Sequence, residues 1–160
     1  MMLSLENPFA VAKTSVNRAL RPTNTNQVVV LAVSPFEGDH LSLQRICSHS
    51  SWKLHQARNY REALACLEKN QISVIISECD VPPYNWRVLL NHLADRDHPP
   101  RLIVTSWHAD DHLWAEVLNM GGFDVLPKPF EPRELFRVVS LAWRTWNDAC
   151  ELPAKAMAAG

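Results

Sequence analysis

Six consecutive apolar residues, Val28-Val29-Val30-Leu31-Ala32-Val33, decide the class of fold to which this chain belongs. A strand that is buried on both faces has this composition, because helices cover each side of a parallel sheet. Shorter apolar runs occupy residues 72–76 and 102–104, and weaker ones occupy residues 52–57 and 123–126. The sequence therefore predicts five strands of a buried sheet.

Apolar residues recur with the period of a helix between these runs, for example at Val88, Leu89 and Leu93. Asp110 or Asp111 is a suitable N-cap for the helix that precedes the fifth run. Five strand–helix units between residues 27 and 147 predict an α/β fold with a doubly wound parallel sheet. We expect residues 1–26 to form a mobile leader and residues 148–160 to form a frayed tail.

The composition is that of an ordinary globular domain and excludes several classes of protein. The chain has 160 residues, of which 47% are hydrophobic, and a formal net charge of −1. A near-neutral chain lacks the positive field of a nucleic-acid or membrane-surface binder, and no apolar run approaches the ~20 residues of a membrane span. Four scattered cysteines and no secretory signal indicate a cytoplasmic protein.

Polar and charged residues follow the predicted strands at their carboxyl ends, where doubly wound sheets place their sites. Glu78 ends the third strand, Thr105 ends the fourth, and Lys128 follows the fifth. A lysine and a hydroxyl beside a carboxylate can hold a negatively charged oxygen group. These three residues are therefore the predicted functional cluster.

In this order and at these spacings, the chain from about Gln27 to Trp146 resembles the receiver domain of two-component response regulators. Lys128-Pro129-Phe130 resembles the receiver's lysine and the Lys-Pro bond after it, and Thr105-Ser106 resembles the hydroxyl residue and its small neighbour. Pro82 resembles the proline found four residues after the phospho-accepting aspartate. The resemblance implies a flavodoxin-like sheet with strand order 2-1-3-4-5.

The chain departs from the receiver pattern at the acidic positions. The residue four places before Pro82 is Glu78, and Val33 and Ser34 occupy the positions of the two acids that hold magnesium in receivers. Glu37 and Asp39 could substitute, but we expect their side chains to point along a helix surface. The resemblance thus implies no cofactor and a doubtful magnesium site.

A glutamate at the acceptor position is one methylene longer than aspartate and places its carboxylate nearer to where phosphoryl oxygens would lie. We therefore interpret the protein as a stand-alone, atypical receiver that is not an enzyme, with Glu78 as a constitutive partial phospho-mimic. The alternative is a receiver that is phosphorylated on Asp80, with magnesium held by Glu37 or Asp39. Asp80 is more simply a surface turn acid, because Val81-Pro82-Pro83 follows it.

The resemblance also implies an output face, made by the fourth helix, the fifth strand and the fifth helix. Val125 stands where receivers carry an aromatic residue that moves with the threonine. The expected contact residues are aromatic: Trp107, Trp114, Phe123 and Trp143. The expected partners are other signalling proteins, a histidine kinase or a regulator, and dimerisation stays open.

His108 and His112 suggest a metal site by their spacing, but a solvated loop and helix start account for them better. A flavodoxin-like redox protein is a further alternative. It would need a Gly/Ser/Thr-rich phosphate loop after the first strand, and Ser34-Pro35-Phe36-Glu37 is not one.

Overall fold

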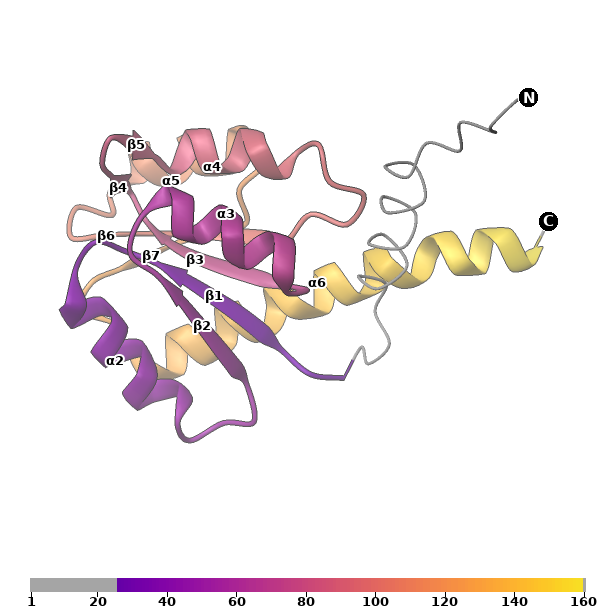
Figure 1. Cartoon of the computed structure of the whole chain (residues 1–160), viewed down its shortest axis with the longest axis horizontal. Coiled ribbons are helices and arrows are strands. Elements are labelled where there is room, and N and C mark those ends of the chain that lie inside the picture. The colour runs from indigo at the N-terminus through magenta and orange to yellow at the C-terminus, as the bar shows by residue number, and fades with distance from the viewer. Residues whose placement is uncertain (1–25, 160) are drawn as a thin grey trace, which may run out of the picture.

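The structure is a computed structural model that describes residues 26–159 of the chain. Its centre is a parallel five-stranded sheet with the order β2-β1-β3-β6-β7 (Figure 1). The strands are β1 (Val29–Val33), β2 (Lys53–Ala57), β3 (Val74–Glu78), β6 (Arg101–Ser106) and β7 (Asp124–Pro127). With β6 and β7 counted as the fourth and fifth parallel strands, this is the predicted order 2-1-3-4-5, and the flavodoxin-like fold is confirmed.

Five helices in the described residues cover the two faces of the sheet (Figure 1). They are α2 (Glu37–Cys47), α3 (Tyr60–Lys69), α4 (Trp86–Leu93), α5 (Asp111–Asn119) and α6 (Pro132–Ala159). Helices α3, α4 and α5 pack into one hydrophobic cluster, and α2 and α6 pack into the other. None of the helices in these residues is long and apolar enough to cross a bilayer.

The run at residues 28–33 supplies both clusters, which explains why it is continuously apolar. Side chains alternate between the two faces of a strand, so Leu31 and Val33 join the cluster under α3 and α4. Val30 and Ala32 join the cluster under α2 and α6. All four residues are buried.

The helix ends follow local capping chemistry. Asp110 is the N-cap of α5, and its Oδ1 accepts a hydrogen bond of 2.8 Å from the backbone N–H of Leu113. Asn59 and Asn85 cap α3 and α4 in the same way. Gly121, just after α5, has φ +100°, which a residue without Cβ adopts without strain. The predicted cap at Asp110 is confirmed.

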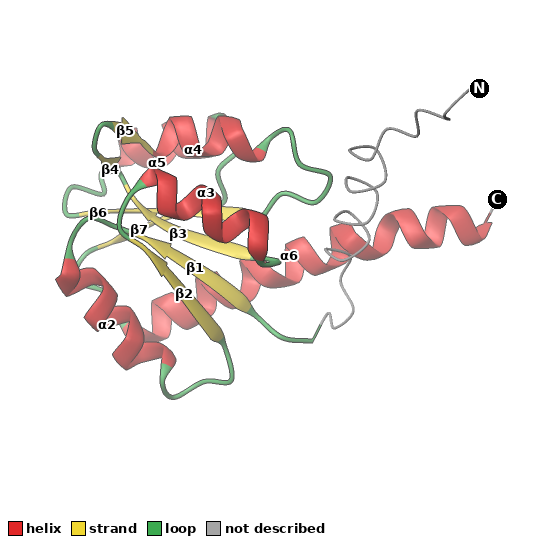
Figure 2. Cartoon of the chain, viewed as in Figure 1, coloured by secondary structure: helices red, strands yellow, loops and turns green. Residues whose placement is uncertain are grey.

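Two features differ from the sequence-based expectation. A short hairpin, β4 (Asp80–Val81) and β5 (Tyr84–Asn85), lies between β3 and α4 (Figure 2). Helix α6 continues to Ala159, whereas we expected a frayed tail from residue 148. The apolar stripe ends at Trp146, but the residues after it are mostly strong helix formers. The expected leader, apart from residue 26, lies outside the described residues.

Candidate functional site

The carboxyl ends of the parallel strands place three predicted residues side by side. In the register of the sheet, Glu78 of β3 lies opposite Thr105 of β6, and Ser106 lies opposite Pro127 of β7. Lys128 follows Pro127 directly, and its backbone N–H bonds the carbonyl of Ser106 at 3.0 Å. The sheet thus brings Glu78, Thr105 and Lys128 to one point.

The Lys128 ammonium is the centre of a buried ionic cluster. Its Nζ forms ion pairs with Glu78 and, at 3.0 Å, with Oδ2 of Asp39. The Lys128 side chain is only 1% exposed, and both carboxylates are buried beside it. Thr105 Oγ1 donates to Glu78 Oε2 at 3.3 Å. We call Asp39, Glu78, Thr105 and Lys128 the ionic cluster.

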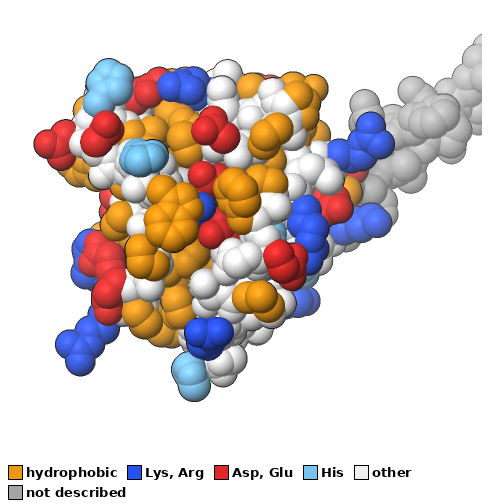
Figure 3. All heavy atoms as spheres, turned by 90° about the vertical axis from the view of Figure 1, so that its left-hand side faces the viewer, with side chains coloured by type: hydrophobic (Ala, Val, Ile, Leu, Met, Phe, Trp, Pro, Cys, Tyr) orange, Lys and Arg blue, Asp and Glu red, His pale blue; other side chains and the backbone are white. Residues whose placement is uncertain are grey.

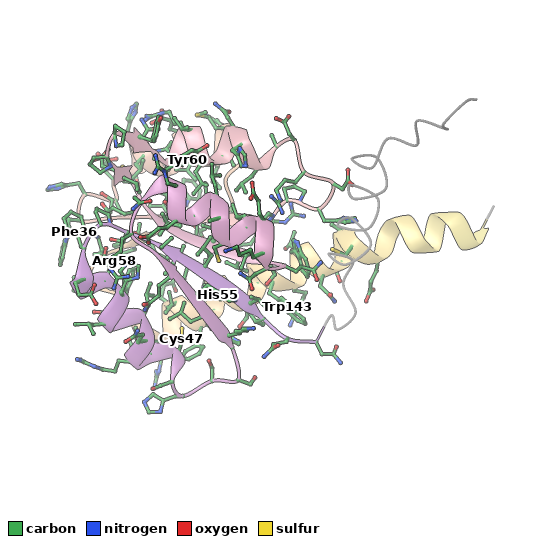
Figure 4. All side chains as sticks on the ribbon, viewed as in Figure 1. Phe36, Cys47, His55, Arg58, Tyr60 and Trp143 are labelled. Carbon is green, nitrogen blue, oxygen red and sulfur yellow. The ribbon has the colours of Figure 1, made fainter. Side chains whose placement is uncertain are left out.

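The position of Asp39 corrects the sequence-based expectation that its side chain lies along a helix surface. Asp39 is in the first turn of α2, and helix side chains tilt toward the N-terminus of their helix. That end of α2 adjoins the carboxyl end of β1, so the carboxylate reaches Lys128. Glu37, two residues earlier, stays exposed and pairs with Arg58 at 2.8 Å. Figure 4 labels Arg58 beside α2.

Ser34 ties Asp39 and the loop after β1 together. Its Oγ donates to Asp39 Oδ2 at 2.6 Å and accepts from the backbone N–H of Phe36 at 3.1 Å. The Ser34 carbonyl accepts a bond of 2.8 Å from Nε2 of the buried His40. Ser34 therefore holds both a carboxylate and the start of α2, although a serine cannot replace the metal-binding acid of a receiver.

Two aromatic rings cover the Lys128 ammonium. Nζ lies 5.0 Å from the ring centroid of Phe36 and 5.4 Å from that of Trp107, which are cation–π distances. Phe36 and Trp107 are themselves 52% and 62% exposed, so the cap is open to solvent on its outer side. On the face that bears the strand ends, hydrophobic side chains surround a small patch of acidic and basic atoms (Figure 3). We call Phe36 and Trp107 the aromatic cap.

The two loops that carry the aromatic cap are built alike. Ser34 at the end of β1 and Ser106 at the end of β6 are both buried. The Oγ of each accepts from the backbone N–H two residues on, that of Phe36 at 3.1 Å and that of His108 at 3.0 Å. These local bonds fix both loops, which orders the rings above the cluster.

Burial dominates the electrostatics of Glu78. Loss of water raises the pKa of its carboxyl above the ordinary value of 4.5, and the charge of Asp39 raises it further. The hydrogen bonds from Lys128 and Thr105 and the charge of Lys128 act in the opposite direction. The net effect is a raised pKa of Glu78. Its ionised form is therefore less favourable in the folded protein than in the unfolded chain.

This shift predicts a pH dependence. When the pKa is raised in the folded state, the contribution of the carboxyl to stability is complete below pH 4.5 and is lost as pH rises through the folded pKa. Urea unfolding of the wild type and of Glu78→Gln at a series of pH values measures this contribution. The unfolding free energy of the wild type minus that of the variant should fall with rising pH across this window. A difference that grows with pH would mean that Lys128 outweighs burial and lowers the pKa.

The other predicted residues lie outside the ionic cluster. Asp80 is exposed in the β4–β5 hairpin, where it pairs with Asn85 through the backbone. Val125 is buried in the core. His108 and His112 are not in any potential metal-binding group of three or more His, Cys, Asp or Glu residues within residues 26–159.

The four aromatic residues of the expected output face take different roles. Trp107 belongs to the aromatic cap. Trp114 is exposed on α5, and its Nε1 donates to Asp124 of β7 at 3.1 Å. Phe123 and Trp143 are partly buried and pack against the cluster under α2 and α6.

A parallel doubly wound sheet with lysine, hydroxyl and acid at its carboxyl edge defines a receiver-like signalling module. Residues 40–140 match the family described as the response regulator receiver domain, and the chain belongs to this family.

Solved structures agree on the fold. The chemotaxis response regulator CheY4 of Vibrio cholerae gives a TM-score of 0.66 at 20% identity, covering 73% of this chain and 99% of that one. A receiver domain of an HD domain-containing protein from Pseudomonas fluorescens gives a TM-score of 0.70 at 24% identity, covering 77% of this chain and 99% of that one.

Curated relatives are similar over part of their length. The response regulator protein FleR of Pseudomonas aeruginosa is 34% identical over 79 residues, which are 49% of this chain and 16% of FleR. The DNA-binding transcriptional regulator NtrC of Salmonella typhimurium is 34% identical over 86 residues, which are 52% of this chain and 18% of NtrC. The transcriptional regulatory protein SrrA of Staphylococcus aureus is 26% identical over 110 residues, which are 68% of this chain and 45% of SrrA. The chain thus spans less than half the length of these relatives.

The sequence-based prediction for Asp39 was wrong, and Phe36 was not identified from the sequence as a residue of the site. Both follow β1 within six residues of its end, in the segment Ser34-Pro35-Phe36-Glu37-Gly38-Asp39 that the sequence marks as a strand end. The place of Asp39 just after the first strand was the available signal, because carboxylates favour the first turn of a helix. That helix, α2, begins beside the strand end that forms the site. No local pattern indicates that the Phe36 ring turns over Lys128.

Proposed function

We propose that this chain is an atypical receiver domain that acts, without being phosphorylated, as a protein-interaction module in two-component signal transduction. The observation that carries the proposal is the buried Lys128 ammonium, which bridges Asp39 and Glu78 beneath the aromatic cap. The Lys128 ammonium already pairs with both buried carboxylates of this site and therefore competes with magnesium for them. Phosphoryl transfer relies on such a metal to neutralise charge in the transition state.

Glu78 supports a fixed signalling state. Its carboxylate accepts from Thr105 and pairs with Lys128, the two groups that would otherwise hold a phosphoryl group. A carboxylate has one charge and two acceptor oxygens, whereas a phosphate has up to two charges and three. Glu78 is therefore a partial mimic, and we expect the site to set one conformation rather than to switch.

The position of Asp80 argues against the alternative, a receiver phosphorylated on this aspartate. Its side chain is exposed on the hairpin and makes none of the contacts with Thr105 or Lys128 that the structure records for Glu78. An acceptor there would lie outside the ionic cluster, in which Glu78 already pairs with Lys128. An aspartate outside the ionic cluster would also lack contact with the buried charges of that cluster.

We infer that partners, a histidine kinase or a regulator, bind the face of α5, β7 and α6 in the cytoplasm. Exposed apolar side chains lie on two of these elements: Trp114 and Leu118 on α5 and Leu141 on α6. Apolar groups that solvent reaches are typical of protein–protein contacts when they lie close together. A second copy of the chain could use the same face.

Magnesium binding tests the proposal, because a ligand that binds the folded state raises its stability. We expect the unfolding temperature to be the same in millimolar magnesium chloride and in sodium chloride of matched ionic strength. Asp39→Asn and Asp80→Asn are measured in parallel. A magnesium-dependent rise in the wild type that Asp80→Asn abolishes would support the alternative, and one that Asp39→Asn abolishes would show that Lys128 does not exclude the metal.

A further inference from the structure

A groove lies between α3 and the β4–β5 hairpin, apart from the residues of the ionic cluster. It has a volume of about 700 Å³ and is open to solvent. Its walls are the exposed side of α3 and the turn that contains Pro82 and Pro83. Figure 4 labels Tyr60 at the start of α3, where the helix approaches the hairpin.

The walls of the groove are mostly aromatic and apolar. The rings of Tyr60 and Tyr84 meet at one end with their centroids 4.8 Å apart and an interplanar angle of 51°. Tyr84 is 47% exposed. Leu64 and the small Ala65 form the middle of the helical wall, so a ligand can approach the backbone of α3 there.

Two opposite charges mark the length of the groove. Arg61 lies near the start of α3 and Glu68 lies near its end, and both line the groove. Seven helical residues place them about 10.5 Å apart along the axis. Neither side chain has an ion pair or a side-chain hydrogen bond within the part of the chain that the structure describes.

We propose that this groove binds a proline-rich segment of a partner protein in the polyproline II conformation, with an acidic residue against Arg61 and a basic residue against Glu68. Proline-rich segments dock into grooves lined by aromatic side chains, because the peptide is already extended and loses little entropy. Tyrosine supplies both an apolar ring and a hydroxyl for the peptide carbonyls. A polyproline II segment rises about 3.1 Å per residue, so charges three residues apart are separated by about 9.3 Å and match the two ends.

The test uses the full chain and three fluorescein-labelled synthetic peptides. The first, Pro-Glu-Pro-Pro-Arg-Pro, has the matching charges. The second replaces its prolines by alanine, and the third, Pro-Arg-Pro-Pro-Arg-Pro, has two basic residues. Fluorescence anisotropy should show that the first peptide binds at least about tenfold more tightly than either control. Equal binding of the proline and alanine peptides, or no binding of any peptide, overturns the proposal.

Protein variants locate the binding. Ala65→Trp fills the middle of the groove and should weaken binding of the first peptide about tenfold or more. Ala115→Trp is the matched control, since Ala115 is also exposed on a helix but lies on α5. Arg61→Glu should change the preference to the third peptide. Circular dichroism confirms that each variant is folded.

Two outcomes would contradict the assignment of the groove. Unchanged peptide affinity in Ala65→Trp would place binding elsewhere on the molecule. Self-association of the wild type that Ala65→Trp abolishes, in the absence of peptide binding, would make the groove a contact between copies of this chain. The phosphorylation state of the chain does not enter the measurement, so failure here leaves the proposed function untouched.

Discussion

Lys128→Met is expected to destabilise the folded protein by about 3–5 kcal/mol, because it leaves two buried carboxylates without their cation. Asp39 and Glu78 are both buried, and the Lys128 ammonium is the cation that pairs with each of them. Methionine keeps most of the length and apolar volume of the lysine stem, so the loss reports the charge rather than a cavity. Urea unfolding at neutral pH gives the value from the midpoint and slope.

Lys69→Met is the matched control, because Lys69 is exposed on α3. It should change the unfolding free energy by less than about 0.5 kcal/mol. Adding Glu78→Gln and Asp39→Asn to Lys128→Met should recover part of the loss, so that the triple variant costs less than the sum of the single changes. Simple additivity would show that the ionic cluster is not a coupled unit.

Glu78→Asp alone is expected to leave the protein without phosphorylation, although it supplies the residue that receivers use as acceptor. Aspartate is shorter, but Lys128 stays paired with Asp39 and the aromatic cap stays in place. Val33 and Ser34 would still stand where receivers carry their two metal-binding acids. Magnesium prefers an octahedron of oxygen ligands, and with Asp39 held by Lys128 it would lack a second free carboxylate. The measurement is intact mass after incubation with acetyl phosphate and magnesium.

A second carboxylate should restore the reaction. Val33 is buried in the core, whereas Ser34 already contacts Asp39, so Ser34→Asp is the better place for it. We expect Ser34→Asp with Glu78→Asp to gain a phosphoryl group only when magnesium is present. An adduct on Glu78→Asp alone would mean that Asp39 already completes a metal site in competition with Lys128.

The sheet could be predicted from the sequence because its strands are buried on both faces. Continuous apolar runs such as those of β1, β3 and β6 are typical of parallel strands, and parallel strands place their carboxyl ends at one edge. The meeting of Glu78, Thr105 and Lys128 follows from that geometry without knowledge of any side-chain rotamer. Residues fixed by the strand register could therefore be predicted from the sequence.

Residues whose positions depend on loops and on helix orientation could not be predicted from the sequence. The burial of Asp39 depends on how the first turn of α2 lies against β1, and the place of Phe36 depends on the Ser34 hydrogen bond. The β4–β5 hairpin has strands of two residues, which are too short to show alternation. These features come from tertiary contacts that a pattern of apolar residues does not encode.

Intact mass spectrometry of the wild type tests most directly whether the buried ionic cluster replaces phosphorylation. The protein is incubated with acetyl phosphate and magnesium beside a phosphorylation-competent receiver as a positive control. We predict that the control gains a phosphoryl group and that this chain gains none. A clear phosphoryl adduct on the wild type that Asp80→Asn removes would contradict the proposed function and support the receiver phosphorylated on Asp80.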